Sequence, residues 1–396
     1  MSDSATERAG RVPPQERLLS LDLYRGLCVL GMMMVDWPAD WDARFNLFNH
    51  AEWTGITAPD FIFPGFMFIA GVAIPFALQT KKAAGVSAGS LYGGIFRRSL
   101  LLFALGYFLN YCWYSGPHGE FSIFSLRLMG VLQRYALVYP IVAIAYLHLD
   151  VKRLLWGAAA LLLGYWALMA LVPVPGFGKP DLMRLPQGLV TPNLATWLDL
   201  KVLRGVIGAD SPYDPEGLLS TLPSIATTII GVAAGQWIRR TELTKEDRAN
   251  SLFVWGVVLA MLGYLWGLSF PLSKKLWSSS FVLLMGGWSL LFFAGLFWAV
   301  DIKSKTSRLL ALPRWYGMNA VAAIVTFTAL EAVLSRLPVG HKANGTALVL
   351  KEFLNDHLLK SWMPDKHASW VYSVVMILLL SLFFRWLDQR KLYLRV

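Results

Sequence analysis

About ten stretches of roughly twenty apolar residues alternate with polar segments along this chain of 396 residues. An α-helix needs about 20 apolar residues to cross a bilayer, and it satisfies its own backbone hydrogen bonds there. The pattern therefore predicts an all-α fold: a polytopic membrane bundle with about 10 transmembrane helices. The expected spans are residues 18–37, 59–80, 95–114, 127–148, 153–172, 217–238, 251–270, 279–300, 315–335 and 368–387.

Lysine and arginine gather at both termini and in every second loop, whereas the intervening loops carry more proline, glycine and tryptophan. Loops rich in lysine and arginine tend to stay in the cytoplasm during membrane insertion. Both termini are then cytoplasmic, which an even number of helices requires. We predict a flexible cytoplasmic tail over residues 1–16 and a single transmembrane domain over residues 17–396.

Composition supports a membrane protein and removes several other classes. The chain is 56% hydrophobic and 15% charged, which is too apolar for an ordinary soluble domain. The net charge of +11 follows from the loop pattern, so we predict no nucleic-acid partner. Cys28 and Cys112 lie in apolar segments, and the histidines share no ligand spacing, so we predict no metal site.

Reactive side chains concentrate in a polar segment that runs from His50 to Asp60, directly before an apolar span. Histidine transfers protons near neutral pH, which makes His50 a candidate base at the mouth of the bundle. An interfacial histidine beside the anchor Trp53 is the alternative. Asp60 and Asp36 lie at span ends on the same side, where either carboxylate could orient the imidazole. Asp36 could also bind an ammonium group, and ordinary helix-end carboxylates are the alternative for both.

Three further polar residues fall inside the fourth predicted span, where ionisable groups are costly. Arg127 and Arg134 are seven residues apart and are expected on one helix face, with Gln133 beside them. A phosphate-bearing ligand in a polar cavity would explain the two arginines. An internal partner such as Asp22 or Asp60 is the other explanation, and it is the one favoured for either arginine alone.

Polar groups near the later spans allow two interpretations each. Asp214 and Glu216 precede the sixth span, where they would either cap the helix or neutralise an amino-sugar cation. Asn319 would either hydrogen-bond inside the bundle or belong to a packing contact around Gly317. Residues 352–359 are expected to form a short amphipathic helix on the membrane surface.

Six short motifs together resemble the heparan-α-glucosaminide N-acetyltransferase family. They recur in the order found in that family, from the first span to the ninth, so the resemblance covers nearly the whole chain. The motifs are residues 17–26 (RLLSLDLYRG), 50–71, 130–134 (GVLQR), 173–176 (PVPG), 213–217 (YDPEG) and 317–319 (GMN).

The resemblance implies transfer of acetyl from acetyl-CoA, as cosubstrate, to the amine of a glucosamine-type sugar or glycan across a membrane. The active-site histidine of the family matches His50, and Asp60, Asp214 and Glu216 fall on matching acidic positions. Asp36 falls where the lysosomal enzyme carries asparagine, which is a departure from the family pattern. The chain resembles a bacterial member, which implies the inner (cytoplasmic) membrane, and the lysosomal relative makes a homodimer an open expectation.

Acetyl transfer needs a base for the amine, stabilisation of the oxyanion, and cations for the phosphates of CoA. His50 would act as the base or carry the acetyl group itself, with Asp60 or Asp36 orienting its ring. Arg134, Arg127 and their neighbour Gln133 are the candidates for contacting CoA. Asp214, Glu216 and Asn319 are the candidates for contacting the acceptor, and Asn319 is also a candidate oxyanion donor.

A transporter for an amino sugar such as N-acetylglucosamine is the competing class. Its intramembrane acids would bind the sugar cation or protons, but the chain shows no internal repeat to support it. A purely structural or lipid-binding membrane protein would leave the buried charges unexplained. Release of CoA in the presence of an acceptor separates an enzyme from a permease.

Overall fold

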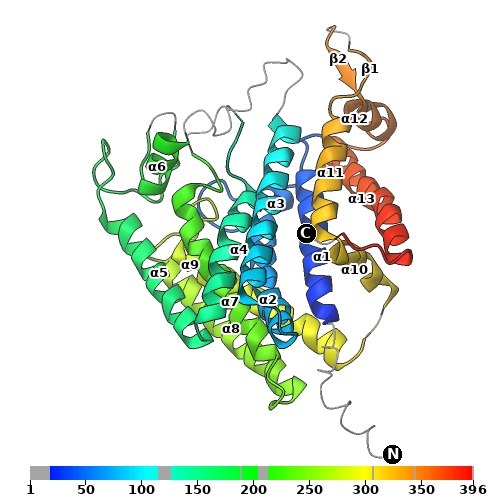
Figure 1. Cartoon of the computed structure of the whole chain (residues 1–396). Coiled ribbons are helices and arrows are strands. Elements are labelled where there is room, and N and C mark those ends of the chain that lie inside the picture. The colour runs from blue at the N-terminus through cyan, green and yellow to red at the C-terminus, as the bar shows by residue number, and fades with distance from the viewer. Residues whose placement is uncertain are drawn as a thin grey trace, which may run out of the picture.

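The helices of this protein stand side by side in one bundle, with α6, α12 and a small hairpin gathered at one end (Figure 1). The structure, a computed structural model, describes residues 18–114, 126–187, 190–203, 213–305, 307–342 and 345–394. The predicted tail over residues 1–16 lies outside the described residues.

Thirteen α-helices account for most of the described chain. They are α1 Leu19–Asp36, α2 Ile62–Ala83, α3 Ala88–Tyr114, α4 Val131–His148, α5 Val151–Leu171, α6 Leu194–Val202, α7 Leu218–Ile238, α8 Lys245–Gly267, α9 Ser279–Leu296, α10 Ala311–Met318, α11 Ala320–Leu334, α12 Leu350–Phe353 and α13 Asp365–Gln389.

Among the described residues, seven helices are long and apolar enough to cross a membrane, and one bent pair would make eight. The seven are α2 with its preceding turn, α4, α5, α7, α8, α9 with its last turn, and α13; the pair is α10 with α11. Helices α1 and α3 occupy the two remaining predicted segments and are not among them. The predicted helical bundle is confirmed, whereas the count of about ten spans and the cytoplasmic termini stay predictions.

The ninth predicted span, residues 315–335, is wrong as a single straight helix. Helices α10 and α11 meet at Asn319 with a bend of 85°. The Asn319 side chain accepts a hydrogen bond from the backbone nitrogen of Leu394 at 2.8 Å and donates to the carbonyl of Leu392 at 3.3 Å. Its amide therefore serves the C-terminal segment, and the helix axis breaks there.

The fourth predicted span begins too early. Helix α4 starts at Val131, so Arg127 precedes it and does not share a helix face with Arg134. The Asn110 side chain donates to the carbonyls of Arg127 at 2.8 Å and Met129 at 2.9 Å. These bonds satisfy two backbone carbonyls in the segment that precedes the helix.

Helix α6 and a β-hairpin occupy segments that we expected to be loops, whereas α12 lies where a short helix was predicted. Helix α6 lies within the segment 173–216, which we expected to be a loop, and Asn193 caps it by accepting from the backbone of Thr196 at 3.0 Å. Strands β1 Pro338–His341 and β2 Ala347–Val349 form a small antiparallel hairpin, so the fold is not purely helical. Helix α12 and the helical turn Leu354–Leu359 realise the expected short helix.

A close approach between α2 and α7 sets the centre of the bundle. A Cβ atom on Gly71 would lie 2.1 Å from the carbonyl oxygen of Thr228, and one on Gly231 would lie 2.0 Å from that of Phe68. Small residues at such crossings let two membrane helices pack backbone to backbone. This contact places the start of α2, with the segment that carries His50, beside the start of α7.

Candidate active site

His50 and Asp60 form a direct hydrogen bond at the start of α2. The Nδ1 atom of His50 lies 2.7 Å from Oδ1 of Asp60. A carboxylate can only accept, so Nδ1 carries the hydrogen and Nε2 of a neutral ring keeps its lone pair. The His50 side chain is 32% exposed and the Asp60 side chain is fully buried. The bond to Asp60 therefore fixes the orientation of the ring, while part of the His50 side chain remains accessible to solvent.

The local sequence explains why Asp60 is held so firmly. Residues Ala58–Phe61 form one 3₁₀ turn, for which Thr57 and Asp60 make a reciprocal capping box. Oδ2 of Asp60 accepts from the Thr57 backbone at 3.0 Å, the Thr57 hydroxyl at 2.9 Å and the Ala51 backbone at 3.2 Å. Of the two predicted carboxylates, Asp60 is the one bonded to the imidazole.

Lys274 joins this pair from the loop between α8 and α9, a residue that the sequence analysis missed. Its Nζ lies 3.2 Å from Nδ1 and 3.4 Å from Nε2 of His50, and 3.7 Å from Oδ1 of Asp60. Burial lowers the pKa of Lys274, while the nearby Asp60, Glu216 and Asp36 oppose that effect. The available signal was a lysine pair, Lys274–Lys275, in a loop predicted to be poor in cations.

Backbone contacts dock the Lys274 loop onto the His50 segment. The backbone nitrogen of Gly55 donates to the carbonyl of Leu272 at 2.8 Å, and the Ser273 hydroxyl donates to the carbonyl of Trp53 at 2.7 Å. The Trp53 indole in turn donates to the carbonyl of Leu182 at 2.9 Å. Lys274 is thus positioned by the backbone of both loops.

A second charged cluster lies beside the start of α7. Arg127 binds Asp214 in a bidentate pair, with Nε–Oδ2 at 2.9 Å and Nη2–Oδ1 at 2.6 Å, and also binds Glu216. Arg127 therefore has internal carboxylate partners, but they are Asp214 and Glu216 and not the suggested Asp22 or Asp60. Asp22 pairs with Arg25 at 3.4 Å within α1.

Arg134 is buried beside this cluster. It donates to the carbonyls of Pro215 at 3.3 Å and Gly217 at 3.5 Å and to the Ser220 hydroxyl, and its guanidinium lies 4.8 Å from the ring centre of Trp277. Its Nε and Nη1 atoms have no hydrogen-bond partner among the described residues. Arg134 therefore braces the start of α7 rather than binding Asp22 or Asp60.

Burial and charge act in opposite directions on the acids of this cluster. Burial would raise the pKa of Glu216, but Arg127, Arg134 and Lys274 outweigh it and hold that pKa at about 2. Burial raises the pKa of Asp199, on α6, to about 7, and the neighbouring Asp214 adds to the effect. The Asp199 carboxylate accepts from the backbone nitrogen of Leu218 at 3.0 Å and so caps α7.

A cavity of about 220 Å³ opens between α1, α3, α4 and α11. Polar groups in its wall are Asp36, Asn110, Arg127, Gln133 and Thr328. Gln133 is buried, and its Nε2 has no hydrogen-bond partner among the described residues. A buried amide without a partner is costly, so a polar ligand in this cavity would satisfy it.

The predicted site residues therefore separate into three groups. They are His50 with Asp60, the charged residues at the start of α7 with the cavity beside them, and Asn319. Asp36 interacts electrostatically with His50, Lys274 and Glu216. The cavity that Asp36 lines also contains Arg127 and Gln133, two of the three residues predicted to bind CoA, whereas Arg134 is not in its wall. Asn319 stands apart, because the Gly317 beside it packs against Asp22 and Gly26 in the first half of α1, away from Asp36 at its end. Within the described ranges, no three His, Cys, Asp or Glu side chains are grouped to hold a metal ion.

Comparison with known proteins gives the same family as the motifs. A family model described as "Heparan-alpha-glucosaminide N-acetyltransferase, catalytic" matches residues 17–265. The human heparan-alpha-glucosaminide N-acetyltransferase is 29% identical over 301 residues, which are 65% of this chain and 44% of the human protein. The mouse protein of the same name is 29% identical over 263 residues, or 56% of this chain and 39% of its own length. The matched regions span less than half the length of these relatives.

The matched region contains the His50–Asp60 pair and both arginines with their acidic partners, and it ends before Lys274. It covers more than half of the chain, which confirms the family predicted from the motifs. This protein belongs to the family of heparan-alpha-glucosaminide N-acetyltransferase catalytic domains.

Proposed function

We propose that this protein is a transmembrane acetyltransferase that moves acetyl from acetyl-CoA to the amine of a glucosamine-type sugar. The observation that carries the proposal is the His50–Asp60 bond of 2.7 Å, which leaves Nε2 as the basic nitrogen of a partly exposed side chain. An oriented imidazole with a buried carboxylate behind it is the arrangement of a general base. The names of the relatives supply the reaction and the acceptor class.

In the proposed reaction, the acceptor nitrogen attacks the thioester carbonyl of acetyl-CoA. Nε2 of His50 takes the proton that the amine loses, the C–S bond breaks, and the thiolate of CoA leaves and is protonated by the imidazolium. Asp60 stabilises the imidazolium, because its Oδ1 accepts the Nδ1 hydrogen throughout. The products are the amide of the sugar and the free thiol of CoA.

Lys274 supplies the positive charge that the thioester oxygen needs as it becomes an oxyanion. Its ammonium lies within 3.4 Å of both ring nitrogens, so it faces the region in which the amine and the thioester would meet. A cation held by its surroundings stabilises developing negative charge without reorganising during the step. We assign the oxyanion role to Lys274 in place of Asn319.

The acceptor sugar is proposed to occupy the cavity beside His50. Asp36 would hold the ammonium form of the incoming amine, which loses one proton to water before the neutral amine attacks. The buried amide of Gln133 would meet sugar hydroxyl groups. Arg127 and Arg134 are balanced by Asp214 and Glu216, so we propose that these four residues shape the wall of the site. The phosphates of CoA then require other cations.

We also propose the membrane, the orientation and the oligomeric state of the enzyme. We place it as a multi-pass protein of the bacterial inner membrane, with the cation-rich loops in the cytoplasm and His50 at the opposite face. The family resemblance suggests a homodimer. The transporter alternative is not favoured, because the relatives found by sequence are named as N-acetyltransferases.

Release of CoA by the detergent-purified protein, given acetyl-CoA and glucosamine, tests the proposal. We expect acceptor-dependent release that falls by about 10²- to 10⁴-fold in His50→Ala. His341→Ala, an exposed histidine of the hairpin, serves as the matched control and keeps full activity. Full turnover in a folded His50→Ala variant would refute the assignment of His50. No CoA release with any amino sugar of a panel, together with sugar uptake into proteoliposomes, would favour the transporter.

Exchange of labelled CoA into acetyl-CoA separates the two chemical routes. An acetyl-His50 intermediate permits exchange without any acceptor, because the first half-reaction is then complete by itself. Direct attack by the amine permits no such exchange. We expect none, because the bond to Asp60 orients the ring as a general base.

A further inference from the structure

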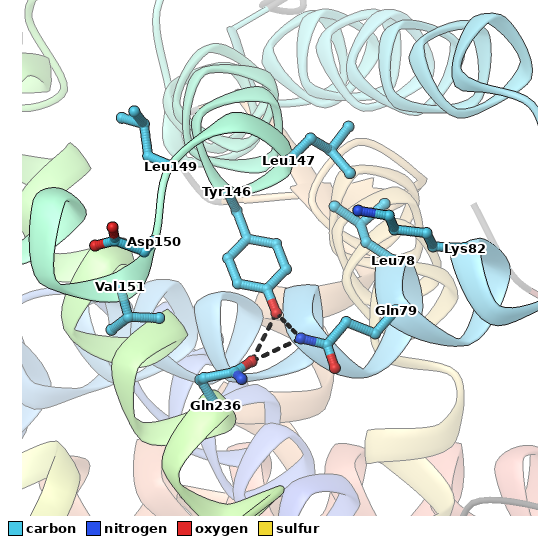
Figure 2. A pocket seen from close by; sticks show the side chains of 9 residues that line it. All are labelled: Leu78, Gln79, Lys82, Tyr146, Leu147, Leu149, Asp150, Val151 and Gln236. Atoms are coloured by element: carbon cyan, nitrogen blue, oxygen red, sulfur yellow. Dashed lines mark hydrogen bonds between the residues drawn. The ribbon is translucent and has the colours of Figure 1, made fainter.

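A second pocket lies at the other end of the bundle, between the ends of α2, α4 and α7. Its volume is about 250 Å³ (Figure 2). Helix α2 rises by 1.5 Å per residue, so Gln79 in this pocket lies about 26 Å along the axis from the start of α2 near Asp60. The close contact of Gly71 with Thr228 and of Gly231 with Phe68 closes the seam between the two ends. The pocket is therefore separate from the site at His50.

Three side chains form a hydrogen-bonded floor in the pocket. The Gln79 amide nitrogen donates to the Tyr146 hydroxyl and to Oε1 of Gln236 at 2.8 Å, and the Tyr146 hydroxyl donates to the same oxygen at 2.7 Å (Figure 2). Nε of Arg239 donates to Oε1 of Gln79 at 2.9 Å, which orients that amide. The amide nitrogen of Gln236 donates to no side chain that the structure describes, so a donor remains for a ligand.

Opposite charges stand on the two rims. Lys82 and Asp150 line the pocket on opposite sides of the Tyr146 ring in Figure 2. The Lys82 ammonium makes no ion pair with a described residue. Asp150 accepts from the backbone of Arg153 at 2.8 Å as the cap of α5, and its exposed carboxylate also lies 3.4 Å from Nε of Arg153 in a surface ion pair. A ligand that fits both rims carries a negative and a positive group.

The surroundings place the pocket at the boundary between hydrocarbon and water. The apolar part of its lining is Leu78, Leu147, Leu149 and Val151. One turn further along α5, Leu155 and Trp156 are exposed, with Trp156 at 77%. Exposed apolar side chains next to a tryptophan are typical of a helix that enters lipid, so the polar rims lie at the level of the lipid headgroups.

We propose that this pocket binds the headgroup of an amine-bearing phospholipid such as phosphatidylethanolamine. The phosphate meets the Lys82 ammonium and the Gln236 amide, the headgroup ammonium meets Asp150, and the first carbons of the acyl chains cover the leucines. Basic pockets between membrane helices recognise lipid phosphates by the same chemistry. The phosphates of an acyl donor such as acetyl-CoA are the other source of that chemistry, and the experiment separates the two.

Native mass spectrometry of the delipidated protein in detergent, titrated with short-chain phosphatidylethanolamine, phosphatidylglycerol and CoA, tests the proposal. We expect tighter binding of phosphatidylethanolamine than of phosphatidylglycerol. Lys82→Gln should weaken both lipids by up to about fivefold, the size of an exposed charge contact. Asp150→Asn should remove only the preference for the amine, because asparagine still caps α5. Lys152→Gln, outside the pocket, is the matched control and should change neither.

Three outcomes would overturn the assignment. Equal lipid binding by Lys82→Gln and Lys152→Gln would mean that the pocket holds no phosphate. Tighter binding of phosphatidylglycerol, unchanged by Asp150→Asn, would remove the role of the amine. Displacement of lipid by CoA from the wild type but not from Lys82→Gln would assign the pocket to the acyl donor.

Discussion

Two charged clusters lie close together near the mouth of this bundle, and they differ in what they leave free. In the first, defined by His50, Asp60 and Lys274, the carboxylate is saturated with hydrogen bonds while the imidazole side chain is partly exposed. In the second, defined by Arg127, Asp214 and Glu216, each charged side chain is engaged with another.

Residue type alone does not tell which of the two clusters is catalytic and which is structural. Both clusters hold charges that are costly to bury, and both belong to the region matched by the family or lie next to it. Only the first contains a basic nitrogen, Nε2 of His50, on a side chain that is partly exposed, with Lys274 as its neighbour. We therefore expect changes in the first cluster to alter the rate, and changes in the second to alter stability.

The largest effect on rate beyond His50 itself is expected for Asp60→Asn. An asparagine amide can donate to Nδ1, which would move the ring hydrogen to Nε2 and remove the base. We expect CoA release to fall by up to about 10⁴-fold, with the thermal midpoint nearly unchanged. Asp42→Asn, an exposed acid of the neighbouring loop, is the control. An active Asp60→Asn enzyme would place the base elsewhere.

Arg127→Ala is expected to cause the largest loss of stability. The change leaves two buried carboxylates without their cation, and breaking such a pair costs about 3–5 kcal/mol. Thermal unfolding in detergent measures the effect, with the exposed Arg184→Ala as the control. Adding Asp214→Asn to Arg127→Ala should restore part of the loss. No restoration would show that packing, rather than charge, holds this cluster.

The stability of the second cluster should also depend on pH through Asp199. Its pKa is raised from 3.8 to about 7 by burial, so the folded protein binds a proton that the unfolded chain loses above about pH 4. Stability should therefore fall as pH rises from 4 to 7 and then level off, by on the order of 4 kcal/mol in total. Thermal midpoints of wild type and Asp199→Asn across this range give the measurement. A parallel decline in the variant would exclude Asp199 as the cause.

Lys274→Gln is expected to lower the rate by about 10²-fold, the cost of one oxyanion donor. Lys274→Arg keeps the positive charge and should restore part of the rate, whereas Lys275→Gln should behave as wild type. CoA release at saturating acceptor measures the effect, and an unchanged rate in Lys274→Gln would reduce Lys274 to a structural contact between loops.

The smallest expected effect is that of Asp36→Asn on the acceptor. Losing one partner of a solvated ammonium contact should raise KM for glucosamine by up to about tenfold, with kcat nearly unchanged. Steady-state kinetics with the acceptor varied would measure it. A fall in kcat instead would move Asp36 into the chemical step and so extend the first cluster.

Sequence alone determined the class of fold and the family, and it named His50 with Asp60 or Asp36 as its orienting carboxylate. Long apolar runs require helices in a membrane whatever their tertiary partners, because the backbone has no other way to bond there. His50 and Asp60 are ten residues apart in one polar segment. Their meeting depends mainly on the local capping box of Thr57 with Asp60, which short-range residue types specify.

The tertiary structure alone decided the contacts between distant segments. Lys274 reaches His50 across 224 residues because two loops share backbone hydrogen bonds, and no local pattern encodes such pairing. The same holds for Arg127, whose partners depend on where α4 begins, and for Asn319, which bonds the C-terminal segment and bends the chain by 85°. Local residue types specify helices and caps, whereas the partner of each charge depends on how the helices pack.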